Sequence, residues 1–215
     1  IIDGTTVPKS GRLAKTSNKL WRAHAGFDLP WENFGHLEVT DEKGGERLDR
    51  IPAQNGEIRI ADRAFMQPDR MPAILDAGAD LVVRAGWKSA RWLDAKGEAV
   101  ELIAELTNAS ETGSIDRPIW IGRKSGAPLK LRLVAIKKPP QAAEAARRTA
   151  RREAQRGGHT ISQGTLAAAD WVILVTSLSV EEFPASDILD LYRLRWRIEL
   201  AFKRLKSVIG LKGPP

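Results

Sequence analysis

One segment near the C-terminal end of the sequence combines residue types that bind anions and cations. Residues 191–206 read LYRLRWRIELAFKRLK, in which Glu199 is the only acid among six arginines and lysines. At 100° per residue, Tyr192, Arg195, Glu199 and Lys206 fall within roughly 60° of one another on a helix. Arginine and tyrosine can donate hydrogen bonds to phosphate oxygens, and a carboxylate is a ligand for hard divalent cations.

Ordinary ion pairing is the alternative explanation for this stripe. Glu199 could pair with Arg195 and Lys203, one helical turn away, for a few tenths of a kcal/mol. The spacing argues for more than that. The order Tyr, two residues, Arg, three residues, Glu, six residues, Lys would arise by chance in about one such chain in a thousand.

Two further acids stand at the ends of short apolar runs. Asp3 follows Ile1-Ile2 and precedes Gly4, and Asp62 ends the run EIRIAD. Each acid has a purely structural alternative. Asp3 could belong to a bare turn, whereas Asp62 could pair with Arg63 or cap the segment that follows it.

Together these motifs resemble the bacterial insertion-sequence DDE transposases of the IS-four family. The resemblance rests on Y-x2-R-x3-E-x6-K in LYRLRWRIELAFKRLKS, on IIDGTT, on RIADRAF, and on the strand WVILVTSL before a proline-containing loop. It spans nearly the whole chain, most specifically at 171–211 and least so at 87–169. By resemblance, Asp3, Asp62 and Glu199 form the catalytic and metal-binding triad.

The resemblance also implies a cofactor and a reaction. Two Mg²⁺ ions, or Mn²⁺ in their place, would be held by the three carboxylates, because hard cations prefer oxygen ligands. Two-metal sites support in-line phosphoryl transfer. We expect the cationic neighbours of Glu199 to offset the charge of the acids in the absence of metal.

Five residues are expected to contact DNA by the same resemblance. Tyr192 and Arg195 would bind phosphate oxygens, and Lys206 would contact the backbone of the DNA end. Trp171 would stack on a flipped base, although a large core residue at a strand start is an equal alternative. Arg84 matches a position that is often basic and near DNA in the family.

Composition agrees with a globular protein that binds an anion. The chain has 215 residues, of which 42% are hydrophobic and 28% charged, and its formal charge is +7 with a pI of about 9.9. The absence of cysteine excludes disulfides, zinc fingers and thiol catalysis. The apolar runs are too short to cross a bilayer and no signal peptide is recognisable. We expect a bacterial, cytoplasmic, nucleoid-associated protein with no membrane partner.

The elements that must position these residues follow from apolar periodicity. We expect an α/β fold with an RNase H-like core, a mixed β-sheet flanked by helices. The core would comprise 1–86, with Asp3 and Asp62, and 171–215, with the Trp171 strand and the Glu199 helix. A mostly β insertion would occupy 87–170. The predicted elements are strands at 1–7, 20–29, 36–41, 57–62, 80–86, 118–122, 129–138 and 171–178, and helices at 71–79, 141–156 and 186–209.

Two helices carry specific expectations. In the helix at 186–209, an apolar stripe should face the core; it comprises Leu191, Leu194, Ile198, Phe202, Leu205 and Ile209. In the helix at 141–156, arginines 147, 148, 151 and 152 recur at i, i+4 spacing. That basic stripe is either a solvated surface or a contact to DNA phosphates.

The predicted function is that of a cut-and-paste transposase catalytic domain. It would cut transposon ends in double-stranded DNA and join them to target DNA, acting as a homodimer in full-length form. We expect end recognition to precede Asp3 and dimer contacts to follow Lys206, so that the chain is a fragment. The alternatives are a metal-dependent nuclease of the same fold, a non-catalytic DNA-binding remnant, and a basic structural protein.

Overall fold

The strands of the chain form two β-sheets. A computed structural model describes residues 1–7, 21–41 and 43–208. The first sheet is antiparallel and has the order β1-β2-β3; its strands are β1 (Ile2–Val7), β2 (Trp21–Asp28) and β3 (Asn33–Thr40). Burial alternates along β3 with a period of two, because successive side chains of a strand point to opposite faces.

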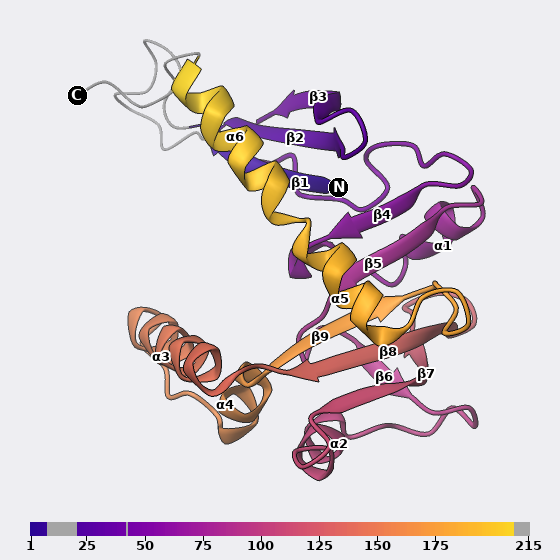
Figure 1. Ribbon diagram of the computed structural model, residues 1–215, viewed down its shortest axis with the longest axis vertical. Helices are drawn as coiled ribbons and strands as arrows, with labels where there is room; N and C mark the ends of the chain where they lie inside the picture. Colours follow the sequence, from indigo (N-terminus) through magenta and orange to yellow (C-terminus); the bar gives the residue numbers. More distant parts are fainter. Residues whose placement is uncertain (8–20, 42, 209–215) are drawn as a thin grey trace.

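The second sheet has six strands in the order β4-β5-β9-β8-β7-β6. Only β4 and β5 pair in parallel, and every other neighbour is antiparallel. Figure 1 shows β1 and β4 side by side, so the two sheets meet along these strands. The strands are β4 (Ile58–Ala61), β5 (Asp80–Arg84), β6 (Arg91–Leu93), β7 (Ser114–Gly122), β8 (Leu129–Lys137) and β9 (Trp171–Thr176).

Several of the predicted site residues lie at one edge of the second sheet, meaning the side formed by the ends of its strands and not an outer strand. Because β4 and β5 are parallel and β9 runs against both β5 and β8, the C-terminal ends of β4, β5 and β8 share this edge with the start of β9. Asp62 follows β4 here, Arg84 ends β5, and Trp171 begins β9. Helices α3 (Pro140–Arg156) and α4 (Gln163–Ala169) extend from the same edge (Figure 1).

The segment at 87–170 differs from the expected mostly β insertion. It contains three strands and three helices, and β6, β7 and β8 continue the six-stranded sheet instead of forming a separate one. Helix α2 (Leu102–Asn108) was not predicted from the sequence; its Leu102 and Leu106 are buried one turn apart. Helix α4 was not predicted either; its first turn is capped by the Ser162 hydroxyl, which accepts from the Thr165 N–H.

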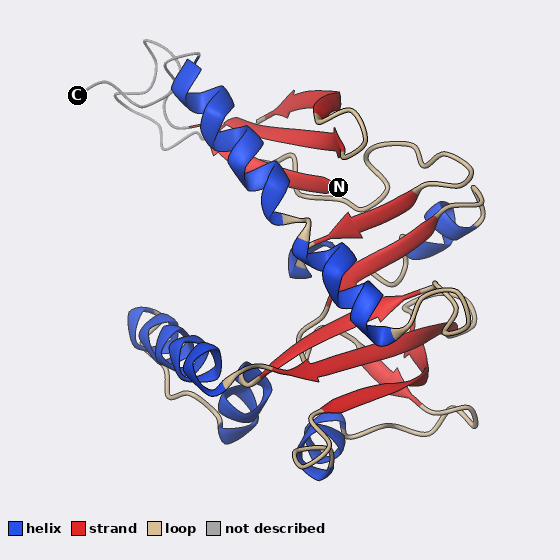
Figure 2. Cartoon of the chain, in the orientation of Figure 1, coloured by secondary structure: helices blue, strands red, loops and turns tan. Residues whose placement is uncertain are grey.

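The expected single helix at 186–209 is divided in two. Helix α5 (Ala185–Arg193) and helix α6 (Trp196–Val208) are separated by Leu194 and Arg195, and residue 209 lies outside the described residues. At this break the N–H groups of Arg195 and Arg197 bond to carbonyls three residues earlier, which is the tighter 3₁₀ pattern. Figure 2 shows this bent helical arm crossing the strands of both sheets.

The division of the arm changes its apolar stripe. Helix α5 buries Ile188 against the second sheet, and α6 buries Ile198 and Phe202 against Ala25 and Phe27 of β2. The expectation for Leu194 was wrong: its side chain is 36% exposed, because the break turns it away from the core.

Two short helical segments complete the fold near Asp62. They are η2 (Arg63–Phe65), a 3₁₀ turn, and α1 (Met71–Leu75), which begins with Pro72 in its first turn as the sequence predicts. No helix among the described residues is long and apolar enough to cross a membrane.

Candidate active site

Asp3 lies on β1 in a largely buried position. Its side chain is 15% exposed, one carboxylate oxygen accepts from the Gly4 N–H at 2.8 Å, and the other accepts from Arg195 Nη1 at 3.3 Å. Asp3 and Thr5 are two residues apart and therefore point to the same face of the strand. This face meets helix α6.

Arg195 links two of the predicted acids. While Nη1 donates to Asp3, Nη2 donates to Glu199 Oε1 at 2.5 Å, so one guanidinium bridges β1 and α6. The ion pair between Arg195 and Glu199 one turn apart is the one that ordinary helix pairing predicts, and the bridge to Asp3 extends it. As expected, a cation offsets the charge of the acids.

Asp62 occupies the end of β4, where it caps η2. Its Oδ1 accepts from the Arg63 N–H at 2.5 Å, which is the capping role considered as its structural alternative. Capping does not remove its charge from the site. The negative charge of Asp62 contributes to raising the pKa values of both Asp3 and Tyr192.

The site disfavours an isolated negative charge on Asp3. Burial raises the pKa of the Asp3 carboxyl to about 6, and the charges of Asp62 and Glu46 add to this effect. The Gly4 N–H and Arg195 oppose it. A crowded, partly desolvated carboxylate of this kind would be stabilised by a bound cation.

Glu46 is an acid near the site that the sequence analysis missed. Its carboxylate packs against the backbone of Gly4, where an added Cβ would lie only 2.7 Å from Glu46 Oε1. A side chain at position 4 would therefore displace the Glu46 carboxylate. Nothing in the sequence around Gly44-Gly45 indicates that the following acid reaches β1.

Tyr192 presents a buried hydroxyl beside Asp62. The hydroxyl oxygen has no hydrogen-bond partner among the described residues. Burial raises the pKa of Tyr192, the charge of Asp62 raises it further, and the charges of Arg84 and Arg195 oppose this. The phenol is thus a hydrogen-bond donor without an acceptor among the described residues, and its neighbours include Asp62 and Arg84.

Lys206, seven residues after Glu199 in α6, connects this helix to β1. Its Nζ donates to the Thr5 hydroxyl at 2.6 Å, two residues along the strand from Asp3. The predicted stripe of Arg195, Glu199 and Lys206 therefore lies along the face of β1 that carries Asp3. Thr5 is a second residue missed in the sequence, although its i+2 relation to Asp3 could have indicated it.

Comparison with known proteins identifies the family of this chain. The model of a family described as the transposase DDE domain matches residues 1–212. The chain belongs to this family. A putative transposase InsL for the insertion sequence element IS186A of Escherichia coli strain K12 is 38% identical over 216 residues, and so is an Escherichia coli transposase for the insertion sequence element IS421. Each match covers 98% of this chain and 57% of the relative, so the chain spans little more than half of their length.

Two tryptophans of this DDE domain differ in exposure. Trp171 is only 4% exposed and packs in the main core, which supports the structural alternative for this residue. Trp196 is 50% exposed, and the Arg197 guanidinium lies over its ring, 5.8 Å from the ring centroid.

Basic residues continue along the sheet edge of the DDE domain. The charge of Arg84 lowers the pKa of Lys138, after the larger effect of burial, so these two cations are neighbours. Lys138 directly follows β8 and donates to the Ala169 carbonyl at 2.6 Å. Lys138 was not among the predicted site residues, although the pair Lys137-Lys138 at the end of a predicted strand could have indicated it.

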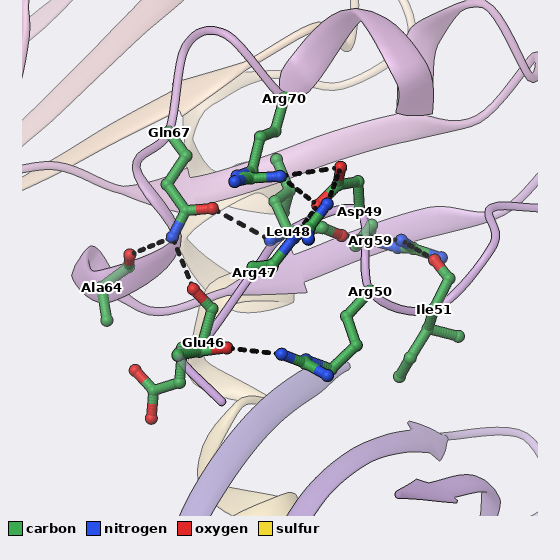
Figure 3. Close-up of polar contacts among 11 residues, drawn as sticks. Glu46, Arg47, Leu48, Asp49, Arg50, Ile51, Arg59, Ala64, Gln67 and Arg70 are labelled. Atoms are coloured by element: carbon green, nitrogen blue, oxygen red, sulfur yellow. Dashed lines mark hydrogen bonds and ion pairs between the residues drawn. The ribbon is translucent and has the colours of Figure 1, made fainter. Parts of the chain in front are cut away.

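A loop of the DDE domain beside Asp3 is held from within by one arginine. Arg59 of β4 is 1% exposed and donates to the carbonyls of Leu48, Ile51 and Pro52 at 2.7–3.2 Å. Figure 3 shows the contacts of Arg59 with Leu48 and Ile51 together with those of Gln67, whose side-chain amide accepts from the Leu48 N–H and donates to the Glu46 carbonyl. The loop that brings Glu46 to Gly4 is thereby fixed to the strand that ends at Asp62.

The three acids are the kind of ligand that Mg²⁺ prefers, but in this structure they are not close enough together to bind one ion. Within 1–7, 21–41 and 43–208, no three histidine or acidic side chains lie close enough together to hold an ion. Arg195 is paired with Asp3 and Glu199, and Asp62 accepts a hydrogen bond from the Arg63 N–H of the turn that it caps. The donors are all carboxylate oxygens, as Mg²⁺ prefers; burial is the main cause of the raised pKa of Asp3, and the charges of Asp62 and Glu46 add to it.

Proposed function

We propose that this domain catalyses phosphoryl transfer on double-stranded DNA, cutting transposon ends and joining them to target DNA. The observation that carries the proposal is the bridge made by Arg195 between Asp3 and Glu199, within the electrostatic reach of Asp62. The bridge links acids of β1 and α6 that are far apart in sequence, and Asp62 after β4 acts on the site through its charge. Family membership supports the same reaction.

An RNase H-like arrangement is the fold we infer. Its support is the lateral order β3-β2-β1-β4-β5, in which an antiparallel three-stranded unit lies beside a parallel pair. We retain 1–86 and 171–215 as the two parts of this core. We treat 87–170 as an insertion whose strands extend the sheet.

The metal-binding role would be shared by Asp3, Asp62 and Glu199. Two Mg²⁺ ions, or Mn²⁺, would supply charge neutralisation at the phosphate and activation of the attacking hydroxyl or water. Glu199 is the most exposed of the three acids, so a metal ion can reach it from solvent. A rotation of the Glu199 side chain would be enough to separate it from Arg195. Asp3 holds its place through the Gly4 N–H.

The neighbouring cations and the phenol would bind and orient the DNA. Arg195 can move from the carboxylates to a phosphate, where its planar fork binds two oxygens. The unpartnered Tyr192 hydroxyl can donate to a phosphate oxygen, and Arg84 lies beside it. Lys206, which lies beside Thr5 of β1, would contact the phosphate backbone of the DNA end. Trp171 would need to leave the core to stack on a base.

Activity, partners and location of the whole protein belong to this proposal. Because the chain spans 57% of its relatives, we propose that homodimerisation and end recognition depend on the full-length protein. Its location would be the bacterial cytoplasm, at the nucleoid, where its DNA substrate lies.

The decisive experiment is cleavage of plasmid DNA carrying the element's own ends by the full-length protein with Mg²⁺. Glu199→Gln and Asp3→Asn should each lower cleavage by about two orders of magnitude or more, because a ligand of the charge-neutralising site is lost. Glu181→Gln, an exposed acid before α5, is the matched control and should cleave at the wild-type rate. Unchanged cleavage by Glu199→Gln would show that Glu199 has no catalytic role.

A further inference from the structure

Helix α3 packs against the other described residues through one face. It begins at Pro140 just after β8, and its buried residues are Ala143 and Ala154. These two alanines are 11 positions apart, which places them within about 20° on the helix, on the side that contacts α4. The remaining surface of the helix is mostly exposed.

Arginines cover the side of α3 away from the alanines: Arg148, Arg152 and Arg156 lie about 130 to 170° round the helix from them, and Arg151 lies about 70° from them. Arg148, Arg151, Arg152 and Arg156 are exposed, and none of them forms an ion pair with a described residue. Arg147 differs because it pairs with Asp170, next to Trp171. The helix contains five arginines and two glutamates, an excess of three positive charges.

The spacing of these arginines suits a repeating anion. Arg148, Arg152 and Arg156 recur every four residues, about 6 Å along the helix axis. Phosphates along one strand of duplex DNA recur every 3.4 Å of axial rise, so each step corresponds to roughly two phosphates. Arginine binds phosphate through two donors at once and remains charged at all relevant pH values.

The position of α3 connects it to the candidate active site. It extends from the sheet edge that carries Asp62 and Arg84, and Lys138 lies between Arg84 and the start of the helix. Figure 1 shows α3 on the same side of the sheet as the ends of β4 and β8. Basic groups thus follow one another from the acids to the helix.

We propose that Arg148, Arg151, Arg152 and Arg156 bind the phosphate backbone of the duplex whose phosphodiester lies at the acids, beyond the point of cleavage. This inference rests on the proposed function and adds a second, sequence-independent DNA contact to it. A membrane surface is the weaker partner, because α3 has no large apolar side chains beside its arginines to enter a bilayer.

Salt dependence of DNA binding by the full-length protein tests the contact. The variant replaces the four arginines by glutamine, which keeps helix propensity; the matched control is Glu144→Gln with Glu153→Gln on the same helix. With a duplex spanning one transposon end and its flank, the variant should bind at least about tenfold more weakly at 0.15 M salt. The slope of log affinity against log salt should fall by about 0.9 for each lost phosphate contact. Lysine at the same four positions should restore most of the slope.

Each result has a defined meaning. An unchanged slope in the glutamine variant, with its helix content intact by circular dichroism, would overturn the proposal. Normal binding to the end duplex with lost capture of separate target DNA would overturn the assignment to the cleaved duplex. Lost binding to vesicles of anionic phospholipid with unchanged DNA binding would assign the stripe to a membrane and overturn the DNA contact. Cleavage by Glu199→Gln would refute the proposed function separately, since the salt slope of the α3 variant does not depend on it.

Discussion

Arg195, at the break between α5 and α6, donates a hydrogen bond to Asp3 of β1 at 3.3 Å across 192 positions of sequence. The same guanidinium holds Glu199 one turn further along. A cationic side chain thus lies between two acids that the proposed reaction requires to bind metal. Proton, arginine and metal ion are therefore alternative ways to offset the same negative charge.

The pH dependence of stability should report the burial of Asp3, to which the charges of Asp62 and Glu46 add. A pKa raised from 3.8 to about 6 means that the folded state binds this proton more tightly than the unfolded state does. The stabilisation of the folded state by this proton is fully present below pH 4, and it is lost as the pH rises through 6. In the absence of divalent ions, Asp3→Asn should therefore be more stable than wild type at pH 7, by about 1 to 3 kcal/mol, and less different at pH 4.5. Urea unfolding at both pH values measures this, and equal destabilisation at both would contradict the raised pKa.

Divalent ions should bind in competition with the proton on Asp3. Mg²⁺ should raise the melting temperature at pH 7.5 and have little effect near pH 5, where the carboxyl is largely protonated. EDTA should reverse the shift at pH 7.5. Glu199→Gln should reduce it, whereas the exposed Glu181→Gln should not. A shift of the same size at both pH values would show that the ion binds elsewhere.

Breaking the internal support of the loop at 46–52 should be costly. Arg59→Met removes the donors to three carbonyls and leaves Glu57 without its partner, so we expect a loss of about 3 to 5 kcal/mol. Arg47→Met on the same loop removes an exposed ion pair with Asp49 and should cost far less. Chemical denaturation of the pair provides the comparison; similar losses would mean that burial of Arg59 does not matter.

The bond between Lys206 and Thr5 should be measurable as a coupling. In a double-mutant cycle with Lys206→Met and Thr5→Val, we expect a coupling free energy of about 1 kcal/mol, because the bond is charged and partly buried. Thr5→Val keeps the shape of the side chain while removing its oxygen. A coupling near zero would indicate that Lys206 is free for DNA without loss of protein stability.

Much of the site could be predicted from the sequence because its signals are local. The spacing of Tyr192, Arg195, Glu199 and Lys206 is read directly from helical periodicity, and Asp3 and Asp62 are marked by the ends of apolar runs. The sequence also predicted α3, β5 and β9 within a few residues. These features depend on residues close together in the chain.

Tertiary structure decided what depends on distant partners. The 3₁₀ break at Leu194 and Arg195 has no proline or glycine to announce it, and it exposes Leu194. The approach of Glu46 to Gly4 and the burial of Trp171 depend on packing between segments that the sequence does not connect. By itself the sequence determined which side chains carry charge and which face of each element they occupy. Only the packing of α6 on β1 decided that Arg195 lies between Asp3 and Glu199, because burial and Coulomb energy depend on positions in space.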